Sequence, residues 1–101
     1  MRALVTGAAG FVGPHLSRAL DACGDEVVGL DQSNGPDLLD GDRWVDTFQQ
    51  HTPDVVFHLA ANPEARWGLD NPRLDLEQGT IATWNVLEAM RRGGVKSLVF
   101  S

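Results

Sequence analysis

The fold is decided by residues Leu4–Gly13, which read LVTGAAGFVG. A short apolar run is followed there by three glycines at G-x-x-G-x-x-G spacing. We expect Gly7 to turn the chain sharply off a strand, at a positive φ angle. Gly10 has no β-carbon, so a pyrophosphate can approach the backbone, and Gly13 lets the next helix pack closely on the strand. Free N–H groups and the dipole at that helix start favour a phosphate. Ordinary turns also carry glycines at this spacing, so the rest of the sequence has to decide.

Apolar strands and amphipathic helices alternate along the chain, which predicts an α/β fold of the Rossmann type. In such a doubly wound fold the sheet is parallel, and we expect the strand order 3-2-1-4. The predicted strands are Arg2–Thr6, Glu26–Leu30, Val55–Ala60 and Lys96–Ser101, and the predicted helices are Phe11–Ala22, Asp42–Gln50 and Pro72–Arg92. The buried face of the last helix is predicted to carry Thr83, Val86, Leu87 and Met90.

The fourth predicted strand ends the chain with no helix after it. Strands of parallel sheets are normally covered on both faces. We therefore expect residues 1–101 to form one truncated domain, the first four strands of a larger one.

Composition limits the classes of partner. The formal net charge of the 101 residues is −6, without a basic patch, which argues against nucleic acid. No apolar run is long enough to span a membrane. The single cysteine, Cys23, cannot form an intrachain disulfide, which fits a reducing cytoplasm, and it is expected to be a small core residue. No pair of histidines has metal-ligand spacing.

Asp31 follows the second predicted strand, 18 residues after Gly13. At that position a carboxylate can accept hydrogen bonds from the hydroxyls of an adenosine ribose. A solvated loop acid is the alternative. The neighbouring side chains Gln32, Ser33 and Asn34 can add polar contacts. No Arg or Lys lies between Asp31 and Arg43, which favours NAD over NADP because a 2′-phosphate would meet a negative charge.

Two further segments are candidates for contacts with a dinucleotide. Asp37-Leu38, before the predicted short helix, can hold an adenine ring, although an ordinary loop acid is nearly as good an interpretation. His58-Leu59-Ala60-Ala61 ends the third strand, where small side chains leave room for a cofactor. His58 is flanked by apolar residues, so we expect a core histidine rather than a catalytic base.

Taken in order, these motifs point to one family. They are TGAAGFVG at residues 6–13, Asp31, Asp37-Leu38, PDVVFHLAA at residues 53–61, NVLEAMR at residues 85–91 and VFS at residues 99–101. Residues 3–101 resemble the N-terminal half of the extended short-chain dehydrogenase/reductases, the NAD-dependent epimerase/dehydratase family. Within it, residues 58–91 look most like the nucleotide-sugar 4-epimerases.

The resemblance implies NAD as cofactor and assigns roles by position. Three glycines match the pyrophosphate turn, Asp31 matches the ribose acid, Asp37-Leu38 matches the adenine contact, and the alanines match the positions beside the ribose and nicotinamide. Together with the candidates above, the predicted cofactor-binding residues are Gly7, Gly10, Phe11, Val12, Gly13, Asp31, Gln32, Asn34, Asp37, Leu38, Leu59, Ala60 and Ala61.

The resemblance also implies an activity, by which a hydride passes between NAD and a carbon of a nucleotide sugar through a keto intermediate. The family uses a Tyr-x-x-x-Lys pair, with the tyrosine as general base, and a Ser/Thr just past Ser101. The chain contains no tyrosine, so we expect it to be inactive alone. Gly79 stands where the family often has Asn. Homodimers are common in the family, and a homodimer is expected here.

Two other functions stay open at this point. The chain can be a non-catalytic NAD-binding module that senses redox state or regulates a partner. It can also be a structural fragment that binds nothing, which a cofactor titration would reveal.

Overall fold

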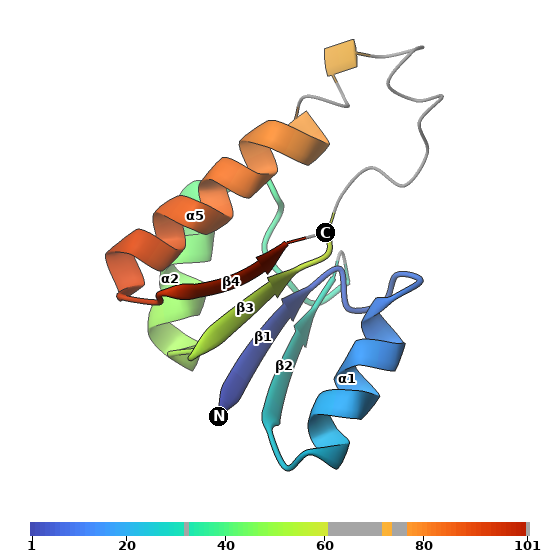
Figure 1. The fold of residues 1–101 in the computed structure, drawn as a ribbon. Coiled ribbons are helices and arrows are strands. Elements are labelled where there is room, and N and C mark those ends of the chain that lie inside the picture. Colours follow the sequence, from blue (N-terminus) through green and yellow to red (C-terminus); the bar gives the residue numbers. More distant parts are fainter. Residues whose placement is uncertain (32, 61–71, 74–76, 101) are drawn as a thin grey trace.

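The computed structural model describes residues 1–31, 33–60, 72–73 and 77–100. Four strands form one parallel sheet in the order β2-β1-β3-β4 (Figure 1). The strands are β1 (Arg2–Thr6), β2 (Glu26–Leu30), β3 (Val55–His58) and β4 (Ser97–Phe100). The predicted Rossmann-like parallel sheet is therefore confirmed, and each strand lies within the range expected for it.

The predicted strand order of 3-2-1-4 is wrong, because β3 pairs with β1 and not with β2. Burial explains the difference. Val55 and Val56 in β3 are buried on opposite faces of the sheet, which requires a central position. In β2 only Leu30 is fully buried, as suits an outer strand. The observed order is the other common arrangement of doubly wound sheets, in which the chain reverses direction at β1.

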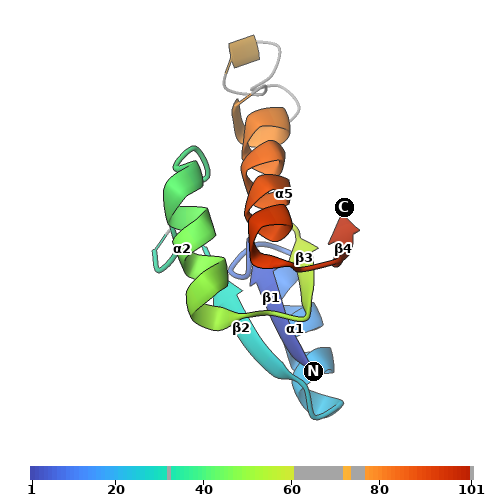
Figure 2. The same cartoon turned by 90° about the vertical axis from the view of Figure 1, so that its left-hand side faces the viewer.

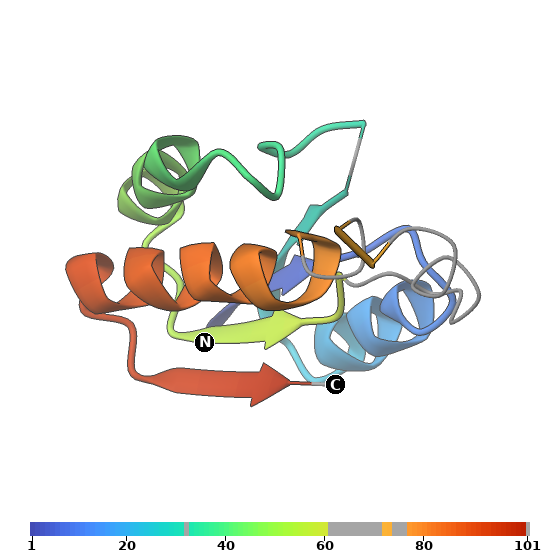
Figure 3. The ribbon, with the colours of Figure 1, turned by 90° about the horizontal axis from the view of Figure 1, so that it is seen from above.

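Helices cover the two faces of the sheet unequally. The helices α2 (Gly41–His51) and α5 (Ala82–Gly93) lie side by side on one face, and α1 (Gly13–Ala22) lies on the other (Figures 2 and 3). A π-helical turn, η1 (Glu77–Ile81), leads into α5 where one continuous helix was predicted. Gly79 lies in this turn, and glycine has a low helix propensity. The predicted loop at residues 62–71 lies outside the described residues.

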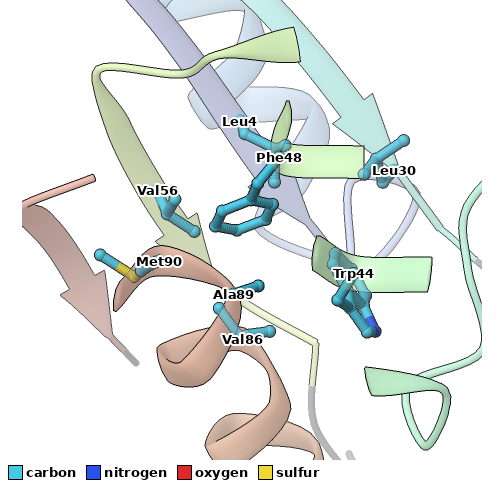
Figure 4. Packing of buried hydrophobic residues seen from close by; sticks show 8 residues of the cluster. All are labelled: Leu4, Leu30, Trp44, Phe48, Val56, Val86, Ala89 and Met90. Carbon is cyan, nitrogen blue, oxygen red and sulfur yellow. The ribbon is translucent and has the colours of Figure 1, made fainter. Parts of the chain in front are cut away.

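The main core lies between the sheet and the pair α2 and α5 (Figure 4). Its buried members are Leu4, Leu30, Trp44, Phe48, Val56, Val86, Ala89 and Met90. Burying each large side chain contributes about 1.5–3 kcal/mol, so this cluster fixes the positions of the two helices.

Two burial predictions are wrong. Leu87 of α5 is 45% exposed, because the buried face of the helix runs instead through Ala82, Asn85, Val86, Ala89 and Met90. Cys23 is also exposed, since it is the C-cap residue of α1 and follows the last helical turn.

Candidate functional site

The carboxyl ends of β1 and β3 are adjacent, and the chain leaves them toward opposite faces of the sheet. After β1 it enters α1 on one face, and after β3 it continues to α5 on the other (Figure 1). In open α/β sheets, ligands bind outside the carboxyl ends of the strands at such a switch point. The glycine turn of residues 7–13 and the segment Leu59-Ala60 both lie at this edge.

The glycine turn lies close to the end of β3. Gly7 has a φ of 67°, as predicted for the residue that turns off the strand. A β-carbon on Gly7 would lie 2.8 Å from the Ala60 nitrogen, so only glycine allows this approach. Gly10 N donates a hydrogen bond to the Gly7 oxygen at 3.0 Å, which closes the turn. A β-carbon on Gly13 would collide with the backbone of Ala8, so the close packing there is against the turn itself.

The start of α1 offers hydrogen-bond donors that the described part of the chain does not use. The N-cap residue Val12 makes no side-chain capping bond, and Pro14 occupies the first turn. The N–H groups of Phe11, Val12 and Gly13 have no acceptor among the described residues. Gly10 faces open space apart from the Gly7 oxygen, which would be 3.2 Å from an added β-carbon. Free N–H groups beside an open glycine at a helix N-terminus suit an anion.

Phe11 and Val12 are exposed by 93% and 53%. The Phe11 ring meets the ring of His15 edge to face, with their centroids 6.5 Å apart. The structure therefore places the Phe11 side chain on the surface, and it leaves the backbone as the part of residues 11 and 12 that can bind a ligand.

The turn after β2 is held by side chains that the sequence had assigned to ligand contacts. Asp31 Oδ1 accepts hydrogen bonds from Ser33 N, at 2.7 Å, and from Ser33 Oγ. These bonds lower the pKa of Asp31, which keeps the carboxylate ionised. Asn34 Oδ1 accepts from Asp31 N and Asn34 Nδ2 donates to Gly29 O, so Asn34 shapes this turn. Gln32 lies outside the described residues.

Asp37 and Leu38 lie in the turn before α2 and are tied to both neighbouring helices. Trp44 Nε1 donates to the Asp37 carbonyl at 3.0 Å, and Asn85 Nδ2 donates to the Leu38 carbonyl at 2.8 Å. Leu38 packs against the core. Among the described residues, no hydrogen bond or ion pair joins Asp37 or Leu38 to Asp31 or to the glycine turn.

His58, the last residue of β3, is 1% exposed, so the predicted core position is confirmed. Its Nδ1 lies 2.8 Å from Thr6 Oγ1 and its Nε2 lies 3.1 Å from Thr83 Oγ1. Thr6 Oγ1 also accepts from the N–H groups of Leu59 and Ala60, at 3.1 and 3.2 Å. From the sequence, no role was predicted for Thr6, and Thr83 was placed only on the buried face of its helix. The available signal for Thr6 was a hydroxyl at the end of an otherwise apolar strand. Ala61 lies outside the described residues.

The described residues contain no group of three or more His, Cys, Asp or Glu side chains that could hold a metal ion. Among the same residues, no helix has the length and apolar character needed to cross a membrane.

Residues 3–101 match the family described as the NAD dependent epimerase/dehydratase family. This chain belongs to that family. The match covers nearly the whole chain and agrees with the glycine turn at the switch point. NAD is the cofactor of the family.

Three UDP-glucose 4-epimerases are similar to this chain in sequence or structure. The chain is 36% identical to the UDP-glucose 4-epimerase of Mycolicibacterium smegmatis, and the match covers 98% of this chain and 37% of that protein. A crystal structure of the Thermus thermophilus UDP-glucose 4-epimerase in complex with NAD has a TM-score of 0.90 and 38% identity, with coverage of 99% and 37%. The Thermotoga maritima UDP-glucose 4-epimerase with UDP-glucose also has a TM-score of 0.90, at 30% identity over 99% and 37%. The chain thus spans little more than a third of these relatives.

Proposed function

We propose that this chain is the NAD-binding portion of a nucleotide-sugar epimerase or dehydratase, with UDP-glucose 4-epimerase as the first candidate. The observation that carries the proposal is the glycine turn at the switch point, with free N–H donors at the start of α1. The named relatives support it, since one structure is a complex with NAD and another contains UDP-glucose. Because the chain spans 37% of the first relative, the substrate and the complete activity are proposals.

The residues of the turn fit a pyrophosphate. The N–H groups of Phe11, Val12 and Gly13 would donate to phosphate oxygens, and Gly10 would let those oxygens reach the backbone. Asp31 Oδ2, which is not the oxygen that accepts from Ser33, would accept from a ribose hydroxyl. Together these groups would hold the adenosine end and the pyrophosphate, and so orient the nicotinamide toward the end of β3.

The chemistry divides between this portion and the rest of the protein. When bound, the nicotinamide supplies hydride transfer, through which a sugar carbon is oxidised to a ketone and reduced again. The chain contains no tyrosine, so the general base that the family resemblance implies comes from outside these 101 residues. The residues of this chain bind and orient the cofactor, and we expect them to give no turnover alone.

A non-catalytic NAD-binding module is the second candidate, because the same glycine turn and Asp31 would serve it. The parent protein separates the two functions, because an enzyme requires a Tyr-x-x-x-Lys pair downstream of Ser101. A purified parent that binds NAD but transfers no hydride to any nucleotide sugar would favour the second candidate.

We also propose a homodimer and a cytoplasmic location. Trp84 and Leu87 on α5 are 61% and 45% exposed, and apolar side chains of this size on one helix support an interface with a second copy. The single cysteine supports a reducing compartment.

The proposal is tested by titrating NAD into the chain and into its Gly10→Val variant. Gly10 does not have a positive φ, and an added β-carbon would touch only the Gly7 oxygen at 3.2 Å. The variant should therefore keep a similar thermal midpoint without NAD. Its affinity for NAD should fall at least tenfold, about 1.4 kcal/mol, because the valine occupies the place of the pyrophosphate. Equal affinity in the two proteins would show that the turn is only structural.

A further inference from the structure

His58 connects three elements at the switch point. Its buried ring lies between Thr6 at the end of β1 and Thr83 in α5, and the residue itself ends β3. The partners are far apart in sequence, 52 and 25 residues from His58. The ring therefore ties the sheet edge to the helix that covers it.

The hydrogen bonds around Thr6 determine which ring nitrogen carries the proton. Thr6 Oγ1 is within hydrogen-bond distance of Leu59 N, Ala60 N and His58 Nδ1. The two amides can only donate, and a hydroxyl oxygen has two lone pairs and one proton. With its lone pairs facing these amides, the Thr6 hydroxyl directs its proton to His58 Nδ1, and Leu59 N also donates to the Thr6 carbonyl at 3.2 Å. The ring is accordingly the neutral tautomer with its proton on Nε2, which donates to Thr83 Oγ1.

A positively charged ring would break this arrangement. It would present a third donor to Thr6 Oγ1, which would have to release the N–H of Leu59 or Ala60. Burial also lowers the pKa of His58, which favours the neutral ring. The neutral state of His58 and the two hydrogen bonds at the end of β3 are thus linked.

The Leu59-Ala60 peptide, which Thr6 holds, also packs against Gly7 of the glycine turn. A β-carbon on Gly7 would lie 2.8 Å from Ala60 N and 2.9 Å from the Leu59 carbonyl carbon. With so little clearance, a shift of the Leu59-Ala60 peptide would move Gly7, and with it the start of the turn. Any change in how His58 holds Thr6 is transmitted by contact to the proposed pyrophosphate turn.

We propose that His58 is a positioning residue for the cofactor, acting as the Nε2–H tautomer that keeps Thr6 as a double acceptor for the Leu59 and Ala60 amides. Its bond to Thr83 holds the ring in that orientation from α5. The role rests on the NAD binding proposed above, and it requires no proton transfer by His58.

The first test reads the tautomer without any cofactor. In ¹⁵N NMR of the chain at neutral pH, His58 should show a pyridine-like Nδ1 and a pyrrole-like Nε2. A Thr6→Val variant, which removes the hydroxyl that donates to Nδ1, should lose this single form, whereas Thr83→Val should keep it. A wild-type ring with its proton on Nδ1 would overturn the positioning role and leave the proposed function untouched.

The second test uses NAD titration to compare the contributions of His58 Nδ1 and His58 Nε2. Asn at position 58 places an acceptor oxygen near the site of Nδ1, whereas Gln reaches toward the site of Nε2 and leaves the Thr6 hydroxyl without an acceptor. His58→Asn should bind NAD within about threefold of wild type, and His58→Gln should bind about tenfold more weakly. The thermal midpoints of both variants are measured to check that each is folded.

The outcomes of the titrations distinguish the two proposals. If His58→Gln binds NAD as tightly as wild type, or more tightly than His58→Asn, the positioning role is wrong. If wild type itself binds no NAD, the proposed function fails and the positioning role fails with it. Should both variants unfold, the tautomer measured in the wild-type chain still decides whether Thr6 is held as described.

Discussion

Gly7 lies directly against the amide of Ala60, at a distance that leaves no room for a β-carbon on Gly7. This contact joins the end of β1 to the end of β3 at the point where the chain diverges to the two faces of the sheet. The positive φ of Gly7 and its small size are therefore both needed, and they can be separated experimentally.

A Gly7→Ala substitution should destabilise the chain by about 2–4 kcal/mol, from the left-handed backbone and the collision with Ala60 together. Gly94→Ala is the matched control, because Gly94 has a φ of 71° and nothing within 4 Å of an added β-carbon. Gly94→Ala should lower the free energy of unfolding only through its left-handed backbone, by about 1 kcal/mol. Urea unfolding measures both free energies, and equal losses would mean that the contact with Ala60 contributes nothing.

The free energy of unfolding should depend on pH because His58 is buried. Its pKa is lowered by burial in the folded chain, whereas in the unfolded chain it titrates near 6.5. Below about pH 6.5 the unfolded state binds more protons, so the free energy of unfolding should fall as the pH is lowered. The slope from this one group is at most about 1.4 kcal/mol per pH unit.

The pH measurement is made between about pH 5 and 7, as urea unfolding at each pH. Asp31 and Glu88 stay ionised there, because hydrogen bonds from Ser33 and from Arg91 lower their pKa values, that of Glu88 to about 2. His58→Leu should lose the slope, and His15→Gln, at an exposed position, should keep it. If His58→Leu keeps the wild-type slope, another group causes it.

The elements of this fold could be read from the sequence, but their order could not. The strands are local apolar runs between turn residues, and all were located within a few residues. Which strand neighbours β1 depends on burial in three dimensions. Val56 is buried because α2 and α5 pack together over its face of β3, and the sequence of neither helix shows that the other is its neighbour.

In the candidate site, too, local features were predictable and contacts between distant segments were not. The glycine turn was predictable because its spacing and the positive φ of Gly7 are local properties. The ring of His58 was correctly expected in the core, yet its bonds to Thr6 and Thr83 arise only when distant segments meet. Asn34 was predicted as a ligand contact, but both polar atoms of its side chain hold the turn after β2.

The 101-residue chain should not interconvert nucleotide sugars. It has no tyrosine to act as the general base that the family resemblance implies, and such catalysis typically contributes about 10²–10⁴-fold. The purified chain is incubated with NAD and UDP-galactose or UDP-glucose, and the sugar products are separated and quantified. Epimerisation above a control without protein would show that another group in this chain serves as the base.

Asp31 should make the protein prefer NAD to NADP. Its carboxylate is kept ionised by Ser33, and it ends β2 where a ribose is proposed to lie. A 2′-phosphate there would add like charge, which after screening by solvent and salt costs about 1–3 kcal/mol, on the order of ten- to a hundredfold in affinity.

Titrations with NAD and NADP should show this ratio in wild type and its loss in Asp31→Ala. Asp21→Ala removes the same charge from the exposed end of α1 and should leave the ratio intact. The preference does not come from Asp31 if wild type binds both cofactors equally, or if Asp31→Ala keeps the wild-type ratio.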